Sequence, residues 1–169
     1  MVELKTLTPE AVPAALDMAK RYRLLNEPDE SASICLDILE VAPDNQEALI
    51  TLFLALTDKF TDDGLNPAFG RAKDVVARLD SAYCKSYYSG ILFERRAKFH
   101  FKQGGPGSGA VAYDWFAKAM RAYGEALARG EPFDLVILDL TIPGGVGGPE
   151  ALDRIRTLDS GFKAIATSG

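Results

Sequence analysis

Hydrophobic side chains recur at steps of three and four residues through residues 1–130, with polar residues between them. This spacing places the apolar side chains on one face of a helix, and the alternation typical of a half-buried strand is absent. Prolines, glycines and Asn/Asp residues interrupt the pattern repeatedly. The sequence therefore predicts helices over Pro9–Leu25, Asp29–Val41, Gln46–Lys59, Pro67–Leu79, Ala82–Lys102 and Ala110–Arg129.

The segments between these helices favour turns. Asn26-Glu27-Pro28 breaks the first helix, and Pro43 follows the second. Residues 61–66 read Thr-Asp-Asp-Gly-Leu-Asn, so Asp62 and Asp63 are interpreted as part of a turn rather than as a metal-binding pair. Residues 104–109, Gly-Gly-Pro-Gly-Ser-Gly, are predicted to form a flexible loop.

The pattern changes near the C-terminal end of the chain. Residues 133–140 form a short apolar run, rich in branched side chains, that is typical of a buried strand in a parallel sheet. The glycine-rich segment 144–148 lacks the features of a nucleotide-binding loop and leads to a predicted helix from Pro149 to about Leu158. Residues 163–168 are a second strand candidate, and strand, helix, strand predicts a right-handed crossover unit.

These patterns predict two parts, a helical module at residues 1–130 and a small α/β segment at residues 131–169. Each helix pair has an apolar face that it cannot bury alone, so three pairs are expected to stack. The expected fold class is mainly α, with three stacked helical hairpins followed by a small parallel β-α-β unit. Two strands leave unpaired edges, so the second part is expected to dock on the helical module or to pair with a second copy.

Composition and charge narrow the class of protein. Of the 169 residues, 47% are hydrophobic, which is ordinary for a globular protein. The net charge of −5 argues against nucleic acid as the main partner, because phosphate binding requires a basic surface. The start of the chain is acidic at Glu3, and the longest apolar stretch, Ala48–Leu56, is too short to span a bilayer. We therefore expect a cytoplasmic protein without membrane contact.

Few residues suit metal binding or acid–base chemistry. Cys35 and Cys84 occupy apolar positions of predicted helices and are expected to be buried free thiols. The chain has no paired-cysteine spacing, and His100 is its only histidine, so no zinc site is expected. Because His100 has no evident partner for acid–base chemistry either, the sequence predicts a protein that is not an enzyme.

The first helix pair has small and large residues at characteristic spacings, where small ones let two helices approach and large ones fill the gap. These residues are Met18, Ala19, Tyr22, Cys35, Ile38, Leu39 and Pro43. This pattern resembles the tetratricopeptide repeat, although Ala15 and Ser31 depart from it and the later pairs up to residue 130 are looser. The resemblance implies a scaffold whose curved surface binds a partner's peptide or helix.

Exposed polar and aromatic residues on or beside the first helix of each pair are candidates for partner contacts. The alternative is that these residues are only a solvated face, which is the commonest arrangement of surface charges. The candidates are Lys20, Arg23, Asn45, Lys85, Tyr88 and Arg95.

A more specific pattern lies in residues 133–145, Phe-Asp-Leu-Val-Ile-Leu-Asp-Leu-Thr-Ile-Pro-Gly-Gly, in which an apolar strand ends at Asp139. The pattern resembles the middle of a bacterial response-regulator receiver domain, which has a flavodoxin-like fold. The resemblance implies that Asp139 accepts a phosphoryl group, and that Asp139 and the carbonyl of Thr141 bind Mg²⁺. It also implies that Ser168 contacts the phosphoryl oxygen.

The receiver pattern is incomplete. Receivers hold Mg²⁺ with an acidic pair after their first strand and carry a lysine after their fifth, whereas this chain has neither and ends at Gly169. A lone carboxylate should accept phosphate poorly, because this chemistry depends on positioned charge. No cofactor is expected, and Mg²⁺ only if the site is completed by other groups.

The leading interpretation is a non-enzymatic protein-interaction scaffold with a receiver-derived appendage that is not competent for phosphotransfer. One alternative is a two-component signalling receiver that is phosphorylated on Asp139. A second alternative is an engineered or truncated fusion without an evolved function. The helix ending at Arg129 fits both resemblances, and gene fusion is one way in which such a shared helix can arise.

Overall fold

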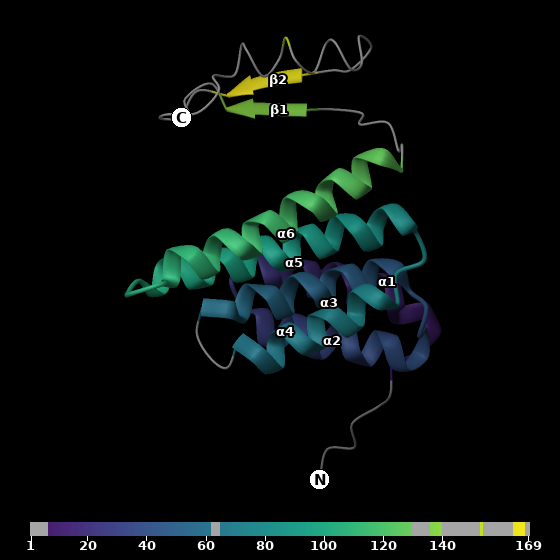
Figure 1. Cartoon of the computed structure of the whole chain (residues 1–169). Coiled ribbons are helices and arrows are strands. Elements are labelled where there is room, and N and C mark those ends of the chain that lie inside the picture. The colour runs from purple at the N-terminus through teal and green to yellow at the C-terminus, as the bar shows by residue number, and fades with distance from the viewer. Residues whose placement is uncertain (1–6, 62–64, 130–135, 140–152, 154–163, 168–169) are drawn as a thin grey trace. The chain divides into compact units, whose positions relative to one another are not determined.

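The structure, a computed structural model, describes residues 7–61, 65–129, 136–139, 153 and 164–167. It divides into two units, residues 1–130 and 131–169, and each is described here by itself. The first unit contains η1 (Pro9–Ala11), α1 (Val12–Leu24), α2 (Pro28–Val41), α3 (Gln46–Asp58), η2 (Lys59–Thr61), α4 (Leu65–Ala77), α5 (Ala82–Gln103) and α6 (Ser108–Ala128), as Figure 1 shows. The six predicted helices are confirmed, with small shifts at their ends.

Polar side chains cap two of these helices at their first turn. The side-chain oxygen of Asn45 accepts a hydrogen bond from the backbone N–H of Ala48 at 2.9 Å, at the start of α3. The hydroxyl of Ser81 accepts one from the backbone N–H of Cys84 at 3.3 Å, at the start of α5. These bonds satisfy backbone donors that have no partner within the helix, and each such cap typically stabilises by about 1 kcal/mol.

A left-handed residue closes α1. Asn26 has a φ of 63°, and its N–H donates to the carbonyl of Arg23 at 3.1 Å. The N–H of Glu27 reaches back to the carbonyl of Tyr22 at 3.0 Å. Together these two bonds form the Schellman end of a helix, which asparagine tolerates better than most residues other than glycine. The predicted break at this position is confirmed.

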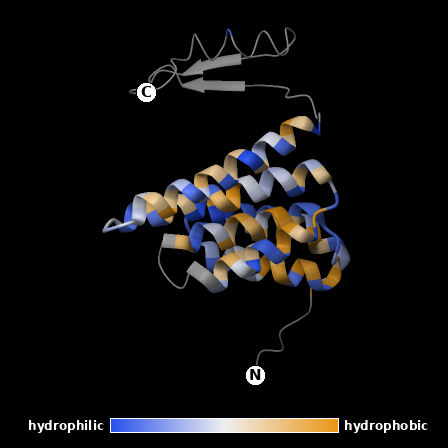
Figure 2. Ribbon diagram, viewed as in Figure 1, coloured by the Kyte–Doolittle hydropathy of each residue, from blue (hydrophilic) through white to orange (hydrophobic). Residues whose placement is uncertain are grey.

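Helix α3 is the centre of the first unit. Leu49, Leu52, Phe53 and Leu56 are at most 2% exposed, and the helix packs against both α2 and α4. Figure 2 shows the concentration of hydrophobic residues along it. A helix that is apolar around most of its circumference is stable only when other elements surround it. Any binding surface of this unit must therefore lie mainly on the outer helices.

Helices α5 and α6 lie side by side (Figure 1), and Gly90 of α5 lies against the ring of Tyr123 of α6. A Cβ atom at Gly90 would lie 2.4 Å from the ring of Tyr123. The Tyr123 hydroxyl continues past this point and donates a hydrogen bond to Oε2 of Glu94 at 2.6 Å. The absence of a side chain at Gly90 is therefore what allows the tyrosine to reach its partner.

The predicted fold class is wrong in its second part. The part of the chain whose side chains are described contains six α-helices and no strand, and the expected β-α-β unit is not seen there. The described residues of the second unit include two four-residue strands, β1 (Val136–Asp139) and β2 (Ala164–Thr167), paired in parallel. Of the helix expected at residues 149–158, only Asp153 is described. An apolar run indicates a strand locally, but a sheet requires further strands to pack with it.

The predicted glycine-rich loop is shorter than expected. Helix α6 already begins at Ser108 and includes Gly109, so the segment is not irregular throughout. Gly107 has a φ of 83° and precedes the helix, and the Ser108 hydroxyl donates to the carbonyl of Gly105 at 2.9 Å. Helix α6 thus begins within the segment for which the glycine content predicted a loop.

The two thiols differ in burial. Cys35 is buried and Cys84 is only half-buried, and both are free, so the prediction of two buried thiols is confirmed for Cys35 alone. Burial raises the pKa of the Cys35 thiol to about 11. Among the described helices, none combines the length and the apolar character needed to cross a lipid bilayer.

Candidate ligand-binding site

The six residues predicted to contact a partner do not form one site. Lys20 on α1 forms an exposed ion pair with Glu47 on α3, with 2.6 Å between Nζ and Oε2. This bond raises the pKa of Lys20. Asn45 is the cap of α3 and therefore has a structural role.

Tyr88 is half-buried and packs against the core. Its ring packs edge-to-face against Phe53, with 5.3 Å between ring centroids. Burial raises the pKa of its hydroxyl. The sequence placed Tyr88 on a partner-binding surface, but much of its ring serves the contact between α5 and α3.

Arg23 and Arg95 share one carboxylate. Asp58, at the end of α3, pairs with Nε of Arg23 on α1 through Oδ2 at 2.8 Å and with Arg95 on α5 through Oδ1. The three side chains are 24–27% exposed, so water screens the two pairs only in part. Both arginines are thus held in a bridge between helices, and a ligand would have to compete with Asp58 for them.

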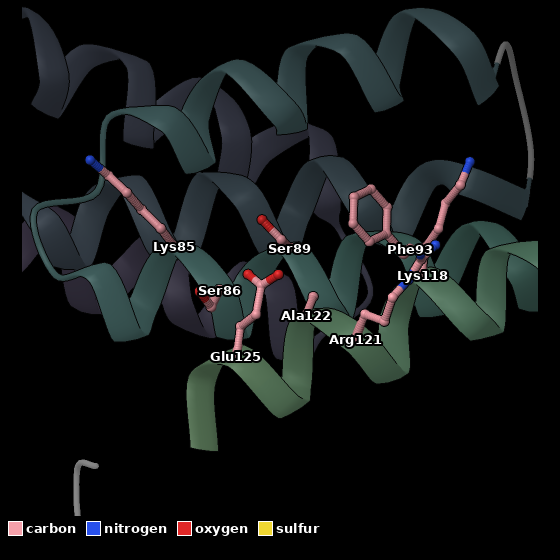
Figure 3. A pocket seen from close by; sticks show the side chains of 8 residues that line it. All are labelled: Lys85, Ser86, Ser89, Phe93, Lys118, Arg121, Ala122 and Glu125. Carbon is pink, nitrogen blue, oxygen red and sulfur yellow. The ribbon is translucent and has the colours of Figure 1, made fainter. Parts of the chain in front are cut away.

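Lys85 differs from the other candidates because it lines a pocket between α5 and α6. This pocket, called the α5–α6 groove here, has a volume of about 410 Å³. Figure 3 shows Lys85 at one end and Phe93 with Lys118 and Arg121 at the other. Its lining residues are Lys85, Ser86, Ser89, Phe93, Lys118, Arg121, Ala122 and Glu125.

Positive charge dominates the α5–α6 groove. Three of its side chains are cationic, and Glu125 is the one acid among them. Within the part of the chain that the structure describes, no ion pair involves Lys85, Lys118 or Arg121. The groove therefore carries a local excess of positive charge on a chain whose net charge is −5.

An aromatic cluster borders the Phe93 end of the groove. The Trp115 and Phe93 ring centroids are 5.8 Å apart, and Nζ of Lys118 lies 3.9 Å from the Trp115 centroid. The guanidinium of Arg96 lies 4.4 Å from the same ring. Cations over an indole face are attracted by the ring quadrupole, and an anion that draws Lys118 away would change the environment of Trp115. Since Trp115 is the only tryptophan of the chain, its fluorescence reports on this end of the groove.

The groove lining offers hydroxyls and charges that can bind a polar ligand. Ser86 and Ser89 supply hydroxyls, but the lining includes no cysteine, histidine or second carboxylate that would activate them. No group of three or more His, Cys, Asp or Glu residues among those described is placed to hold a metal ion. His100 lies outside the groove against Phe99, and burial lowers its pKa.

The receiver-like candidates fall largely outside the described residues. Thr141 and Ser168 are not described, and neither is the pair Asp62-Asp63. The backbone of Asp139 ends β1, opposite Thr167 of β2, but its side-chain surroundings are not described.

Sequence reasoning found one groove residue and missed the others. Lys85 was a candidate, whereas Lys118, Arg121 and the two serines were not. A usable signal was present, since Lys118, Arg121 and Glu125 are spaced by three and four on one edge of a helix. That spacing does not reveal which neighbouring helix the edge faces.

Comparison of the chain with protein-family models, curated proteins and solved structures finds no match. The likenesses to tetratricopeptide repeats and to receiver domains therefore stay predictions that rest on the residues themselves.

Proposed function

We propose that the helical unit is a non-enzymatic protein-interaction scaffold that binds an acidic peptide in the α5–α6 groove. The observation that carries the proposal is the set of three cations, Lys85, Lys118 and Arg121, around one groove without ion-pair partners among the described residues. Unpaired cations are well solvated in water, and a ligand that supplies carboxylates forms charge-assisted hydrogen bonds with them.

The dimensions of the groove favour a short extended segment. Lys85 and Phe93 are eight residues apart on α5, which corresponds to about 12 Å along the helix. An extended peptide covers that length with about four residues. An acidic side chain fits between Lys118 and Arg121, and an apolar neighbour fits against Phe93 and Ala122.

The test is a titration of the full chain with the blocked peptide Ac-DEFDE-amide, followed by Trp115 fluorescence and by calorimetry. We expect saturable binding that weakens with salt, because the contacts are charge pairs near the surface. The same peptide with lysine at each acidic position is expected not to bind. Equal binding of both peptides would contradict the proposal.

Charge reversal locates the site. Arg121→Glu removes an attraction and adds a repulsion, each worth about 0.5–1 kcal/mol at an exposed position, so the Kd is expected to rise about tenfold. Lys73→Glu on α4 is the matched control, because Lys73 is exposed, lies outside the groove and undergoes the same change of charge. If both variants weaken binding equally, the effect is one of net charge and the α5–α6 groove is not the site.

A further inference from the structure

Helix α6 has an exposed face without a charged residue. Tyr113, Met120 and Leu127 are 72%, 74% and 58% exposed, although all three are large and hydrophobic. They are spaced by seven residues, close to two helical turns, so they form one row along the helix. The alanines that pack in the core, Ala119 among them, are on a different face of α6.

A second row, of small residues, runs beside the first. Ala110, Ala117 and Gly124 are also spaced by seven, and each precedes a large residue by three positions. Ala110 and Gly124 are exposed, and no atom lies within 4 Å of a Cβ built at Gly124. This face, called the α6 stripe here, therefore has a row of large side chains beside a row of small residues, and both rows have the same spacing of seven residues.

The two rows are complementary to each other when a second α6 runs antiparallel. A two-fold axis midway between Lys118 and Ala119 sets each large residue opposite a small one of the second copy. In that register Tyr113 faces Gly124 and Met120 faces Ala117, and Leu127 faces Ala110. All three large residues find a small counterpart in one register, as ridges that pack into grooves require.

Charges at the edge of the stripe fit the same register. Asp114 and Arg121 lie on one side of it, both exposed, and no ion pair of either is found among the described residues. In the antiparallel arrangement Asp114 of one copy comes within two helical positions, about 3 Å along the axis, of Arg121 of the other. The two-fold axis repeats this pair, so two opposite-charge contacts flank the apolar seam.

We propose that the α6 stripe is a homodimer interface, occupied by α6 of a second copy of this chain in an antiparallel arrangement. The contact spans about 26 Å from Ala110 to Leu127 and about 10 Å across, or about 260 Å² on each helix. A standard stable interface has about 800 Å² per partner, so the dimer forms by weak, concentration-dependent association. The apolar seam lies outside the α5–α6 groove, although Arg121 at its edge also lines that groove. The proposal does not depend on peptide binding.

The test is sedimentation velocity of the full chain from low micromolar to near-millimolar concentration. We expect a monomer that converts to a dimer as concentration rises, and Met120→Glu is expected to leave only monomer. Gly124→Leu fills the space that Tyr113 of the second copy would occupy, and it is also expected to leave only monomer. It should also leave the fold intact, since the position is open and leucine favours a helix. Leu24→Glu is the matched control, because Leu24 is 81% exposed on α1 and outside the stripe.

Charge exchange tests the register. Asp114→Arg and Arg121→Asp are each expected to weaken the dimer, and the double exchange is expected to restore it. A chain that stays monomeric at every concentration would overturn the proposal. So would a dimer that persists in both Met120→Glu and Gly124→Leu, because it would then use another surface.

Discussion

Replacing Gly90 with alanine tests the close approach of α5 and α6 directly. In an exposed helix interior this change stabilises by up to about 1 kcal/mol, because alanine is the better helix former. Here the new Cβ would lie 2.4 Å and 2.5 Å from two carbons of the Tyr123 ring, whereas carbon atoms prefer about 3.5–4.0 Å. The ring must therefore move by roughly 1 Å.

That movement has two costs. Overpacking of this kind destabilises by about 1–3 kcal/mol. A shift of the ring also stretches the 2.6 Å bond from the Tyr123 hydroxyl to Glu94 beyond hydrogen-bonding distance, and a bond to a charged group contributes about 1.5–3 kcal/mol. After the helix gain is subtracted, Gly90→Ala is expected to lower the free energy of unfolding by about 1.5–5 kcal/mol.

Urea unfolding followed by circular dichroism measures the change. The decisive comparison is the same substitution in a Tyr123→Ala background, where no ring opposes the new methyl group and Gly90→Ala is expected to become stabilising. Gly70→Ala is the matched control, since a Cβ there meets nothing within 4 Å and the change should stabilise α4. If Gly90→Ala stabilises the chain while Tyr123 is present, the close approach is wrong.

Three further predictions concern single groups. Burial opposes ionisation of Glu94, but hydrogen bonds from Lys98 and Tyr123 outweigh it and lower the pKa of Glu94 from 4.5. The ionised carboxylate therefore stabilises the fold above pH 4.5, and this stabilisation is lost as the pH falls through the lowered pKa. Glu94→Gln should flatten this loss in acid-unfolding curves. A thiol reagent at pH 8 is expected to modify Cys84 in the folded chain and Cys35 only after unfolding, since Cys35 is fully buried with a pKa of about 11, and equal rates would contradict this. Acetyl phosphate with Mg²⁺ is expected to add no mass to the chain; an adduct that Asp139→Asn abolishes would favour the signalling receiver instead.

The helices were predictable because their signals are local. Hydrophobic spacing, capping residues and the break at Asn26-Glu27-Pro28 act within a few residues of the chain, and the structure follows them. The onset of α6 was missed, since its signal is a backbone conformation at Gly107 that the letters Gly-Pro-Gly-Ser-Gly do not disclose. The β-α-β unit was predicted wrongly: the described residues show β1 and β2, but of the helix expected between them only Asp153 is described. A local apolar run indicates a strand but does not specify the elements that must pack with it.

The site was less predictable than the fold because it depends on which helices meet. Arg23 and Arg95 are far apart in the sequence, and nothing in their surroundings indicates that Asp58 binds both. Lys85 was identified as a charged helix residue, but it lines the same groove as Lys118 and Arg121 only because α5 and α6 lie side by side. Local patterns show which residues are available, and tertiary packing decides which of them share a pocket.

The carboxylate shared by Arg23 and Arg95 also affects how the helical unit unfolds. In an array whose helices contact only their sequence neighbours, the ends can fray independently and stability is a sum of neighbouring terms. Asp58 instead joins α1, α3 and α5, so melting of α1 leaves the charge balance around α5 altered. The first and last pairs are thereby coupled through one side chain, and we expect the unit to melt as a single cooperative block rather than pair by pair.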